Sequence, residues 1–213
     1  MKTPTVVLIG FSTTGKSTYL KKIKDGLSDS ISDFDSDEFL SREYDGHVYN
    51  IFMKLGREAI KYIESKEEEF LRFVTAYSDK PQLIAAGPFL VQRKEEWDRF
   101  VNERNPYIIH LNKSVESIYE WLIKRREKHK GELDVSNPNF GSWDDGVTTE
   151  LLNGKYQDLP KSRSLENIKG HLDAITPVYE NYRDAVFDSD TLWNDSEMSN
   201  GLVKLISAKL ISR

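Results

Sequence analysis

The sequence predicts an α/β domain in which helices cover both faces of a parallel β-sheet. Short apolar segments rich in β-branched residues alternate with longer segments of helical periodicity, as in parallel strands joined by helical crossovers. The first apolar segment also runs directly into a glycine-rich loop that opens a helix. The strand candidates are residues 5–9, 31–34, 82–86, 106–111 and 185–187. Because helices separate them, we expect one parallel sheet and no second domain.

Helical periodicity fills the intervals between the strand candidates. The helical segments are 17–25, a stretch up to residue 77 with breaks near Gly46 and Gly56, 95–104, 114–130, a stretch from Leu165, and 200–211. The second of these has a stripe of apolar residues at helical spacing, formed by Ile60, Ile63, Phe70, Leu71, Val74 and Tyr77. We expect this stripe to be buried and residues 66–69 to form the charged solvent face. In the helix that Ser114 caps, we place Trp121 and Leu122 inward.

Composition limits the classes of function. The chain of 213 residues has 35 acidic and 30 basic side chains, and a net charge of −5 argues against a nucleic-acid partner. The absence of cysteine excludes disulfides and thiolate ligands. No apolar run approaches the roughly 20 residues that span a bilayer. We therefore expect a cytoplasmic monomer or weak dimer without a membrane partner, folded as a single domain over residues 1–213.

The histidines show no metal-ligand spacing. His110 lies in an apolar strand candidate, so we expect a hydrogen-bonded core residue there. Residues 131–162 lose all periodicity and are rich in turn formers, with Phe140, Trp143 and Tyr156 among them. So long a stretch is either a functional lid or a disordered segment, and the aromatic residues favour a lid over residues 130–163.

A phosphate-binding loop follows the first strand candidate. Gly10 to Ser17 reads GFSTTGKS, which matches Gly-x-x-x-x-Gly-Lys-Ser between a strand and a helix. Gly10 and Gly15 let backbone amides turn toward the phosphates, while Lys16 reaches the β- and γ-phosphates and the Ser17 hydroxyl ligates Mg²⁺. The sequence therefore predicts a nucleoside triphosphate site with Mg²⁺ as its metal. Its residues are Gly10, Ser12, Thr13, Thr14, Gly15, Lys16, Ser17 and Thr18.

Alternating carboxylates follow the second strand candidate. Residues 33–38 read DFDSDE, and the carboxyl end of a strand beside the phosphate loop is where a ligand binds in open α/β sheets. Two carboxylates there can divide the tasks of orienting hydrated Mg²⁺ and facing an acceptor hydroxyl. They can equally form a capping cluster for the next helix. The base-reading motif of GTPases, Asn-Lys-x-Asp, is absent, because residues 112–115 read NKSV.

Over its first two-thirds and beyond, the chain resembles the shikimate kinase family. The matching segments are GFSTTGKST, DFDSDEFL, Gly56 with Ile60 to Glu64, LIAAGPF, HLNKSVESI and Pro177-x-Tyr179. The resemblance implies a five-stranded parallel sheet of order 2-3-1-4-5, ATP with Mg²⁺, and phosphoryl transfer to a hydroxyl of a small molecule. It assigns Asp35 to the metal and makes Asp37 and Lys16 catalytic. It places the acceptor against residues 36–65, with Asp37, Lys61 and Gly87 as its contacts.

The departures from the family fall on the acceptor side. Lys61 and Ile175 stand where the family has carboxylate-gripping arginines, and Gly87-Pro88-Phe89 replaces a triple-glycine turn. These changes argue against shikimate as the acceptor. Arg125 and Arg126, before the lid segment, are candidates for contact with ATP. Two alternatives stay open: a kinase for a nucleoside, nucleotide or macromolecular hydroxyl, and a nucleotide-binding regulatory module without kinase activity.

Overall fold

A computed structural model of the chain describes residues 3–27, 30–44, 48–77, 79–88, 90–129 and 161–211. The expected lid over residues 130–163 lies almost wholly outside the described residues. Its last three residues open a helix that runs to Tyr182. None of the helices in the described parts of the chain is long and apolar enough to cross a membrane.

Five parallel strands form one sheet in the order β2-β3-β1-β4-β5, so the predicted fold and strand order are confirmed. The strands are β1 (Thr5–Ile9), β2 (Ser32–Asp35), β3 (Gln82–Ala85), β4 (Tyr107–Asn112) and β5 (Ala185–Asp188). In the central strand, Val7 pairs with Ile84 on one side and Ile108 on the other. Every residue of β1 is buried, which is why this strand reads as a continuous apolar run.

Helices cover both faces of this sheet. On one face, α1 (Lys16–Leu27) and α10 (Ser196–Ile211) pack against Val6 and Leu8 of β1. On the other face, Val7 and Ile9 pack in a core to which a second group of helices contributes. These are α4 (Ala59–Ala76), α5 (Lys94–Arg104), α6 (Val115–His129) and α8 (Lys161–Tyr182).

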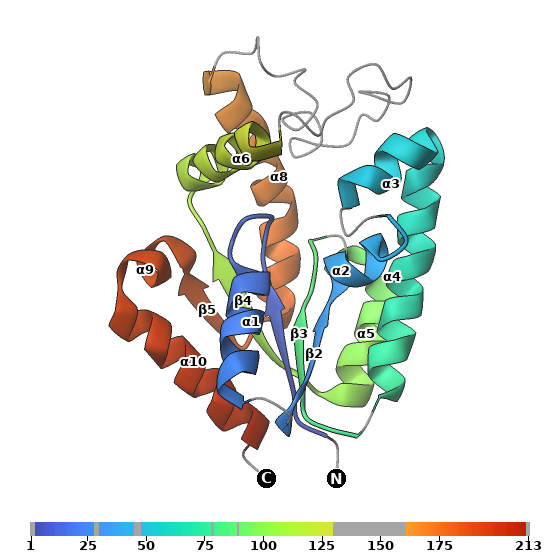
Figure 1. The fold of residues 1–213 in the computed structure, drawn as a ribbon, viewed down its shortest axis with the longest axis vertical. Helices are drawn as coiled ribbons and strands as arrows, with labels where there is room; N and C mark the ends of the chain where they lie inside the picture. Colours follow the sequence, from blue (N-terminus) through green and yellow to red (C-terminus); the bar gives the residue numbers. More distant parts are fainter. Residues whose placement is uncertain are drawn as a thin grey trace.

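The carboxyl ends of the strands point toward the end of the molecule that carries α2, α3 and α6 (Figure 1). The shorter elements are α2 (Ser36–Ser41), α3 (Val48–Leu55), the 3₁₀ turns η2 (Gly56–Glu58) and η3 (Leu90–Gln92), and α9 (Ser189–Asn194). The sequence did not indicate α9, which begins where Asp188 accepts hydrogen bonds from the N–H groups of Asp190 and Thr191.

The burial of three helical side chains, Glu67, Ile60 and Trp121, differs from the prediction. Glu67 is only 2% exposed because it continues the buried stripe of Ile63, Phe70 and Val74, so the prediction that residues 66–69 are a solvent face is wrong at this position. Ile60 lies outside that stripe and is 45% exposed.

Trp121 is 41% exposed, whereas Leu122 is buried as expected. The buried side of α6 follows Ile118 and Leu122, one helical turn apart, and Trp121 lies at its margin. Both Glu67, the buried carboxylate, and Trp121, the exposed tryptophan, lie toward the carboxyl ends of the strands.

Candidate active site

The phosphate loop connects β1 to α1 in the geometry that its sequence predicts. Gly10 has a positive φ of 149°, and a Cβ there would lie 2.4 Å from the carbonyl oxygen of Leu111. Only glycine allows this approach of the loop to β4. Thr13 also has a positive φ, 70°, so the loop stores strain at a non-glycine residue, as functional loops often do.

Hydrogen bonds hold the loop in this shape from inside. Lys16 is buried, and its Nζ donates to the carbonyls of Gly10 at 2.8 Å and Phe11 at 3.0 Å. Thr14 Oγ1 donates to the Phe11 carbonyl at 2.9 Å. The ammonium group of Lys16 therefore already lies across the loop that would surround the phosphates.

Two side chains from distant segments hold the loop from outside. Ser189 Oγ donates to the carbonyl of Thr14 at 2.9 Å, and Lys113 Nζ donates to the carbonyl of Thr13 at 3.1 Å. Lys113 is buried at the end of β4, and burial lowers the pKa of its ammonium group. Sequence reasoning missed Lys113, because nothing in the order of residues links it to a loop about a hundred residues earlier.

The start of α1 presents hydroxyl groups beside the loop. Ser17 and Thr18 are exposed, Ser12 and Gly15 are partly buried, and Thr13 Oγ1 is a buried hydroxyl without a hydrogen-bond partner among the described residues. Unsatisfied groups at a helix N-terminus suit an anion.

Asp35 and Asp37 flank the start of α2. Asp35 Oδ1 accepts the backbone N–H of Asp37 at 2.9 Å, so the capping interpretation of this acidic segment holds. Asp37 is exposed in the first turn. Capping engages one oxygen of Asp35, and a carboxylate has two, so the cap does not exclude a role in metal binding.

Gly87, at the end of β3, lies directly against this segment. Its N–H donates to Ser36 Oγ at 2.7 Å, and a Cβ at position 87 would lie 2.8 Å from Asp37 Oδ1. A side chain there would displace Asp37. Because β3 lies between β1 and β2, the structure brings Asp37 and Gly87 together at the carboxyl edge of the strand beside the phosphate loop.

Lys61 and Ile175 do not bring a cation to Asp37. The Lys61 side chain is 79% exposed and forms an ion pair with Glu58, with Nζ and Oε2 3.5 Å apart. Ile175 belongs to α8, and its side chain is buried in the core. Of the three predicted acceptor contacts, the structure thus unites Asp37 with Gly87 and leaves Lys61 on the exposed side of α4.

A partly buried ion-pair cluster lies near Asp37 instead. Arg93, just before α5, donates from Nη1 to Glu64 Oε1 at 2.8 Å and from Nε to Glu67 Oε2 at 2.9 Å. The pKa of Glu67 is raised to about 7. Burial is the main cause, Arg93 partly offsets it, and the charges of Asp37 and Glu64 add to the rise. Burial lowers the pKa of Arg93, and its bonds to Glu67 and Glu64 raise it by more.

The sequence contained one signal for this cluster. Glu64 and Glu67 are three residues apart on a helix, so they share a face, and Glu67 falls on the apolar stripe. A buried carboxylate requires a partner, and only the fold identifies that partner as Arg93.

Two exposed tryptophans adjoin the other side of the phosphate loop. Trp193 in α9 is 46% exposed, and its ring lies 3.5 Å from where a Cβ on Gly15 would be. The rings of Trp193 and Trp121 have centroids 5.9 Å apart and are tilted by 36°. Lys113 Nζ lies 5.0 Å from the centroid of the Trp121 ring. Arg125 and Arg126 belong to α6, but their side chains lie outside the described residues.

A shallow cleft extends this aromatic pair along α1. It is lined by Thr18, Tyr19, Lys22, Leu192, Trp193, Asn194, Ser196 and Ser199. A cleft with an exposed aromatic wall beside a phosphate loop can accept a flat base.

His110 and Tyr179 pack together beneath the loop, with ring centroids 4.8 Å apart. Burial lowers the pKa of His110 to about 4, and the positive charges of Arg183 and Lys16 contribute. Burial raises the pKa of Tyr179. His110 is a core residue as expected, but its Nδ1 has no hydrogen-bond partner in the described parts of the chain, so the expectation of a hydrogen bond is wrong for that nitrogen.

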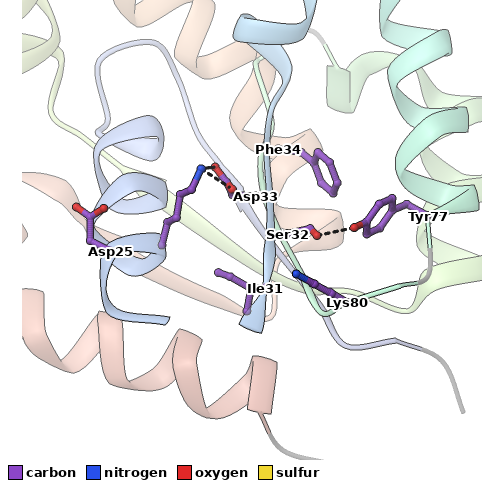
Figure 2. A pocket seen from close by; sticks show the side chains of 8 residues that line it. Asp25, Ile31, Ser32, Asp33, Phe34, Tyr77 and Lys80 are labelled. Atoms are coloured by element: carbon purple, nitrogen blue, oxygen red, sulfur yellow. Dashed lines mark hydrogen bonds and ion pairs between the residues drawn. The ribbon is translucent and has the colours of Figure 1, made fainter. Parts of the chain in front are cut away.

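Another hollow lies away from the loop, along the outer edge of β2 (Figure 2). Its lining side chains already pair with one another: Lys24 with Asp33 at 3.0 Å, and Ser32 with Tyr77 at 2.7 Å. It shares no residue with the phosphate loop, and we exclude it from the site.

Comparison with known proteins decides the family. A shikimate kinase of Staphylococcus aureus strain Newman is 30% identical over 192 residues, covering 87% of this chain and 95% of that protein. The chain belongs to the shikimate kinase family. The shikimate kinase of S. aureus strain JH9 is 25% identical over 185 residues, with the same coverage. No family model matches the chain.

Solved shikimate kinases share the fold of the chain. The enzyme from Bacteroides thetaiotaomicron has a TM-score of 0.61 at 16% identity, covering 99% of both chains. The enzyme from Acinetobacter baumannii in complex with shikimate has a TM-score of 0.56 at 15% identity, covering 99% of this chain and 96% of that one. The chain thus has the P-loop fold of the solved shikimate kinases, and the predicted resemblance is confirmed.

Proposed function

We propose that the chain transfers the γ-phosphate of ATP, with Mg²⁺, to a hydroxyl group of a small molecule. The observation that carries this proposal is the meeting of Asp37 and Gly87 at the strand edge beside the Lys16 loop. An anion-binding loop and an exposed carboxylate at neighbouring strand ends are the two groups that phosphoryl transfer to an alcohol requires.

The loop residues hold the triphosphate in this proposal. Backbone N–H groups between Gly10 and Ser17 and the N-terminus of α1 bind the β-phosphate. The Lys16 ammonium group leaves the carbonyls of Gly10 and Phe11 and binds the β- and γ-phosphate oxygens. Lys113 and Ser189 keep the loop in shape through their bonds to its carbonyls.

Ser17 and Asp35 fit Mg²⁺, because a hydroxyl and a carboxylate are hard oxygen ligands and Mg²⁺ completes its shell with waters and phosphates. Bound there, Mg²⁺ supplies charge neutralisation between the phosphates. The metal in this proposal takes most of its ligands from the nucleotide and water.

Asp37 receives the acceptor. Its carboxylate accepts a hydrogen bond from the acceptor hydroxyl and orients that oxygen in line with the γ-phosphorus. The new bond joins the acceptor oxygen to the γ-phosphorus as the bond to the β–γ bridging oxygen breaks, and the hydroxyl proton passes to Asp37. Trp193 and Trp121 contact the nucleotide base.

The test measures ADP release by the full chain from Mg-ATP with a panel of hydroxyl compounds. We expect release that depends on the acceptor. Lys16→Ala should lower it at least ~1000-fold without changing the melting temperature, whereas Lys21→Ala, an exposed lysine on the same helix, should leave it unchanged. Nucleotide binding without stimulated turnover across the panel would favour the regulatory module.

A further inference from the structure

We propose that Lys113 is a positioning residue for phosphate binding: it holds the carbonyl of Thr13 so that the following N–H group, that of Thr14, faces the phosphates. This inference rests on the nucleotide site of the proposed function and adds a residue that acts on the phosphates through the loop. Its basis is the contact between the end of β4 and the loop, together with the geometry of the peptide bond.

The fold places Lys113 against the middle of the loop. β1 and β4 are neighbouring strands, so the segments that follow them also lie side by side. The approach is closest at Gly10, where a Cβ would lie 2.4 Å from the carbonyl oxygen of Leu111. Two residues after Leu111, the Lys113 side chain is 3% exposed and donates from Nζ to the Thr13 carbonyl at 3.1 Å. Lysine is rarely so buried without a partner, and here the ammonium group is directed at the loop.

A hold on this carbonyl sets the direction of an N–H group. The peptide bond between Thr13 and Thr14 is planar and trans, so its C=O and its N–H point in opposite directions. Lys113 binds the oxygen on one side, and the Thr14 N–H is therefore presented on the other. Ser189 repeats the arrangement one residue later, because its Oγ donates to the Thr14 carbonyl at 2.9 Å and the Gly15 N–H points away from that oxygen. Side chains of two distant segments thus set the directions of two successive N–H groups.

The backbone of this part of the loop has the alternation of an anion-binding concavity, and it is strained at Thr13. φ is positive at Thr13, 70°, and at Gly15, 91°, but not at Thr14 between them. Such alternation turns successive N–H groups toward one point, where an anion binds. Gly15 adopts a positive φ freely, whereas a β-branched threonine does so at a cost. The hydrogen bond from Lys113 to Thr13 offsets that cost, so Lys113 keeps the concavity formed before a nucleotide arrives.

The test compares Lys113→Met with Lys124→Met. Methionine keeps an unbranched apolar side chain and removes the ammonium group. Lys124 is exposed on α6, and its Nζ lies 5.5 Å from the centroid of the Trp121 ring, which Lys113 faces at 5.0 Å. The control therefore loses the same charge beside the same ring.

Calorimetry measures the affinity of the full chain and of each variant for ADP and for inorganic triphosphate, with Mg²⁺ present. We expect Lys113→Met to weaken the binding of both ligands at least ~10-fold, and Lys124→Met to change either by less than ~3-fold, because its charge is exposed and screened. Unchanged affinity in Lys113→Met overturns the inference. Equal losses in the two variants also overturn it, because charge beside the Trp121 ring would then account for both.

A double-mutant cycle distinguishes positioning from direct contact between Lys113 and a phosphate. Glycine adopts a positive φ without strain, so Thr13→Gly removes the cost that Lys113 offsets. In the Thr13→Gly background, the loss caused by Lys113→Met should shrink from at least ~10-fold to less than ~3-fold. An equal loss in both backgrounds would mean that Lys113 does not act through Thr13, and it contradicts the inference.

A measurement on the unaltered chain does not depend on whether a variant folds. Addition of inorganic triphosphate with Mg²⁺ should move the amide proton resonances of Thr14 and Gly15 downfield in nuclear magnetic resonance spectra, because these N–H groups then donate to an anion. Resonances of Thr14 and Gly15 that stay in place while the triphosphate binds overturn the inference, as does absence of binding by the unaltered chain.

ADP release with the acceptor panel, measured separately, distinguishes this inference from the function beneath it. Weaker binding of both ligands by Lys113→Met, in a protein whose unaltered form gives no acceptor-dependent ADP, contradicts the proposed phosphotransfer and leaves the role of Lys113 standing. Acceptor-dependent release by the unaltered chain, with undiminished affinity in Lys113→Met, supports the transfer and contradicts the role of Lys113.

Discussion

The cationic side chains on the nucleotide side and on the acceptor side of the candidate site have different kinds of hydrogen-bond partner. On the nucleotide side, Lys16 donates to two backbone carbonyls of the loop, partners that a phosphate can replace without leaving a buried charge behind. On the acceptor side, Arg93 donates to two carboxylates, one of them buried. The first side is arranged to receive negative charge, and the second has already neutralised its cation.

Among the variants that test the separation of the two sides, a replacement of Asp37 should have the largest effect. We expect Asp37→Asn to lower kcat by about 100-fold or more, because the acceptor hydroxyl loses its proton acceptor, while the KM for ATP changes little. Steady-state kinetics with varied ATP and acceptor measure both. Asp33→Asn, on the same segment and paired with Lys24, serves as the control. A large rise in the KM for ATP would mean that Asp37 also contributes to nucleotide binding, which contradicts the separation of the two sides.

Removal of Arg93 should destabilise the fold. Arg93→Ala leaves the carboxylate of Glu67 buried without its partner, and breaking such a pair costs roughly 3 to 5 kcal/mol. Urea denaturation measures the free energy of unfolding. Arg72→Ala breaks an exposed pair with Glu68 and should cost at most about 1 kcal/mol. Equal costs would mean that the acceptor-side cluster is no more than a surface ion pair.

Glu67 should make stability depend on pH. Its folded-state pKa is raised from 4.5 to about 7, so its contribution to stability is fully present below pH 4.5 and is lost as the pH rises through 7. The free energy of unfolding of the wild type, relative to Glu67→Gln, should fall by up to about 3 kcal/mol over that interval. Denaturation at several pH values measures it, with Glu68→Gln as a flat reference. A relative stability that stays constant or rises with pH contradicts the assignment.

The aromatic pair should give the smallest effect. Trp193→Ala removes a stacking surface for the base and should weaken ADP binding about 10-fold, with no change in the binding of inorganic triphosphate. Titration calorimetry with both ligands measures the difference, and Trp97→Phe, in the core beneath α5, controls for loss of aromatic volume. An equal loss of affinity for ADP and for inorganic triphosphate would mean that Trp193 maintains the shape of the phosphate loop and does not contact the base.

The difference between the nucleotide side and the acceptor side also explains what could be predicted from the sequence. The phosphate loop is contiguous, and its glycines, Lys16 and Ser17 have fixed spacing, so it could be recognised without a fold. The strands β1, β3 and β4 could be found because buried parallel strands are largely continuous apolar runs. The acceptor side is assembled from α2, the end of β3, α4 and Arg93, and no local pattern joins these segments.

Two errors have the same physical origin. Glu67 was assigned to solvent because of its charge and Trp121 to the core because of its hydrophobicity, although helical position decides burial. Glu67 lies in line with Ile63 and Phe70, whereas Trp121 lies outside the line of Ile118 and Leu122. Both exceptions adjoin the site, where polar burial and apolar exposure serve ligands.

Lys113 links two parts of the nucleotide site through a single ammonium group. Its Nζ donates to the strained residue Thr13 and also faces the ring of Trp121. A base that moves this ring also changes the surroundings of the ammonium group that holds the loop. If the chain binds ATP as proposed, selection of the base and the shape of the phosphate cradle would be coupled through this ammonium group, and a triphosphate without a base would meet a loop with a different restraint from the one that ATP meets.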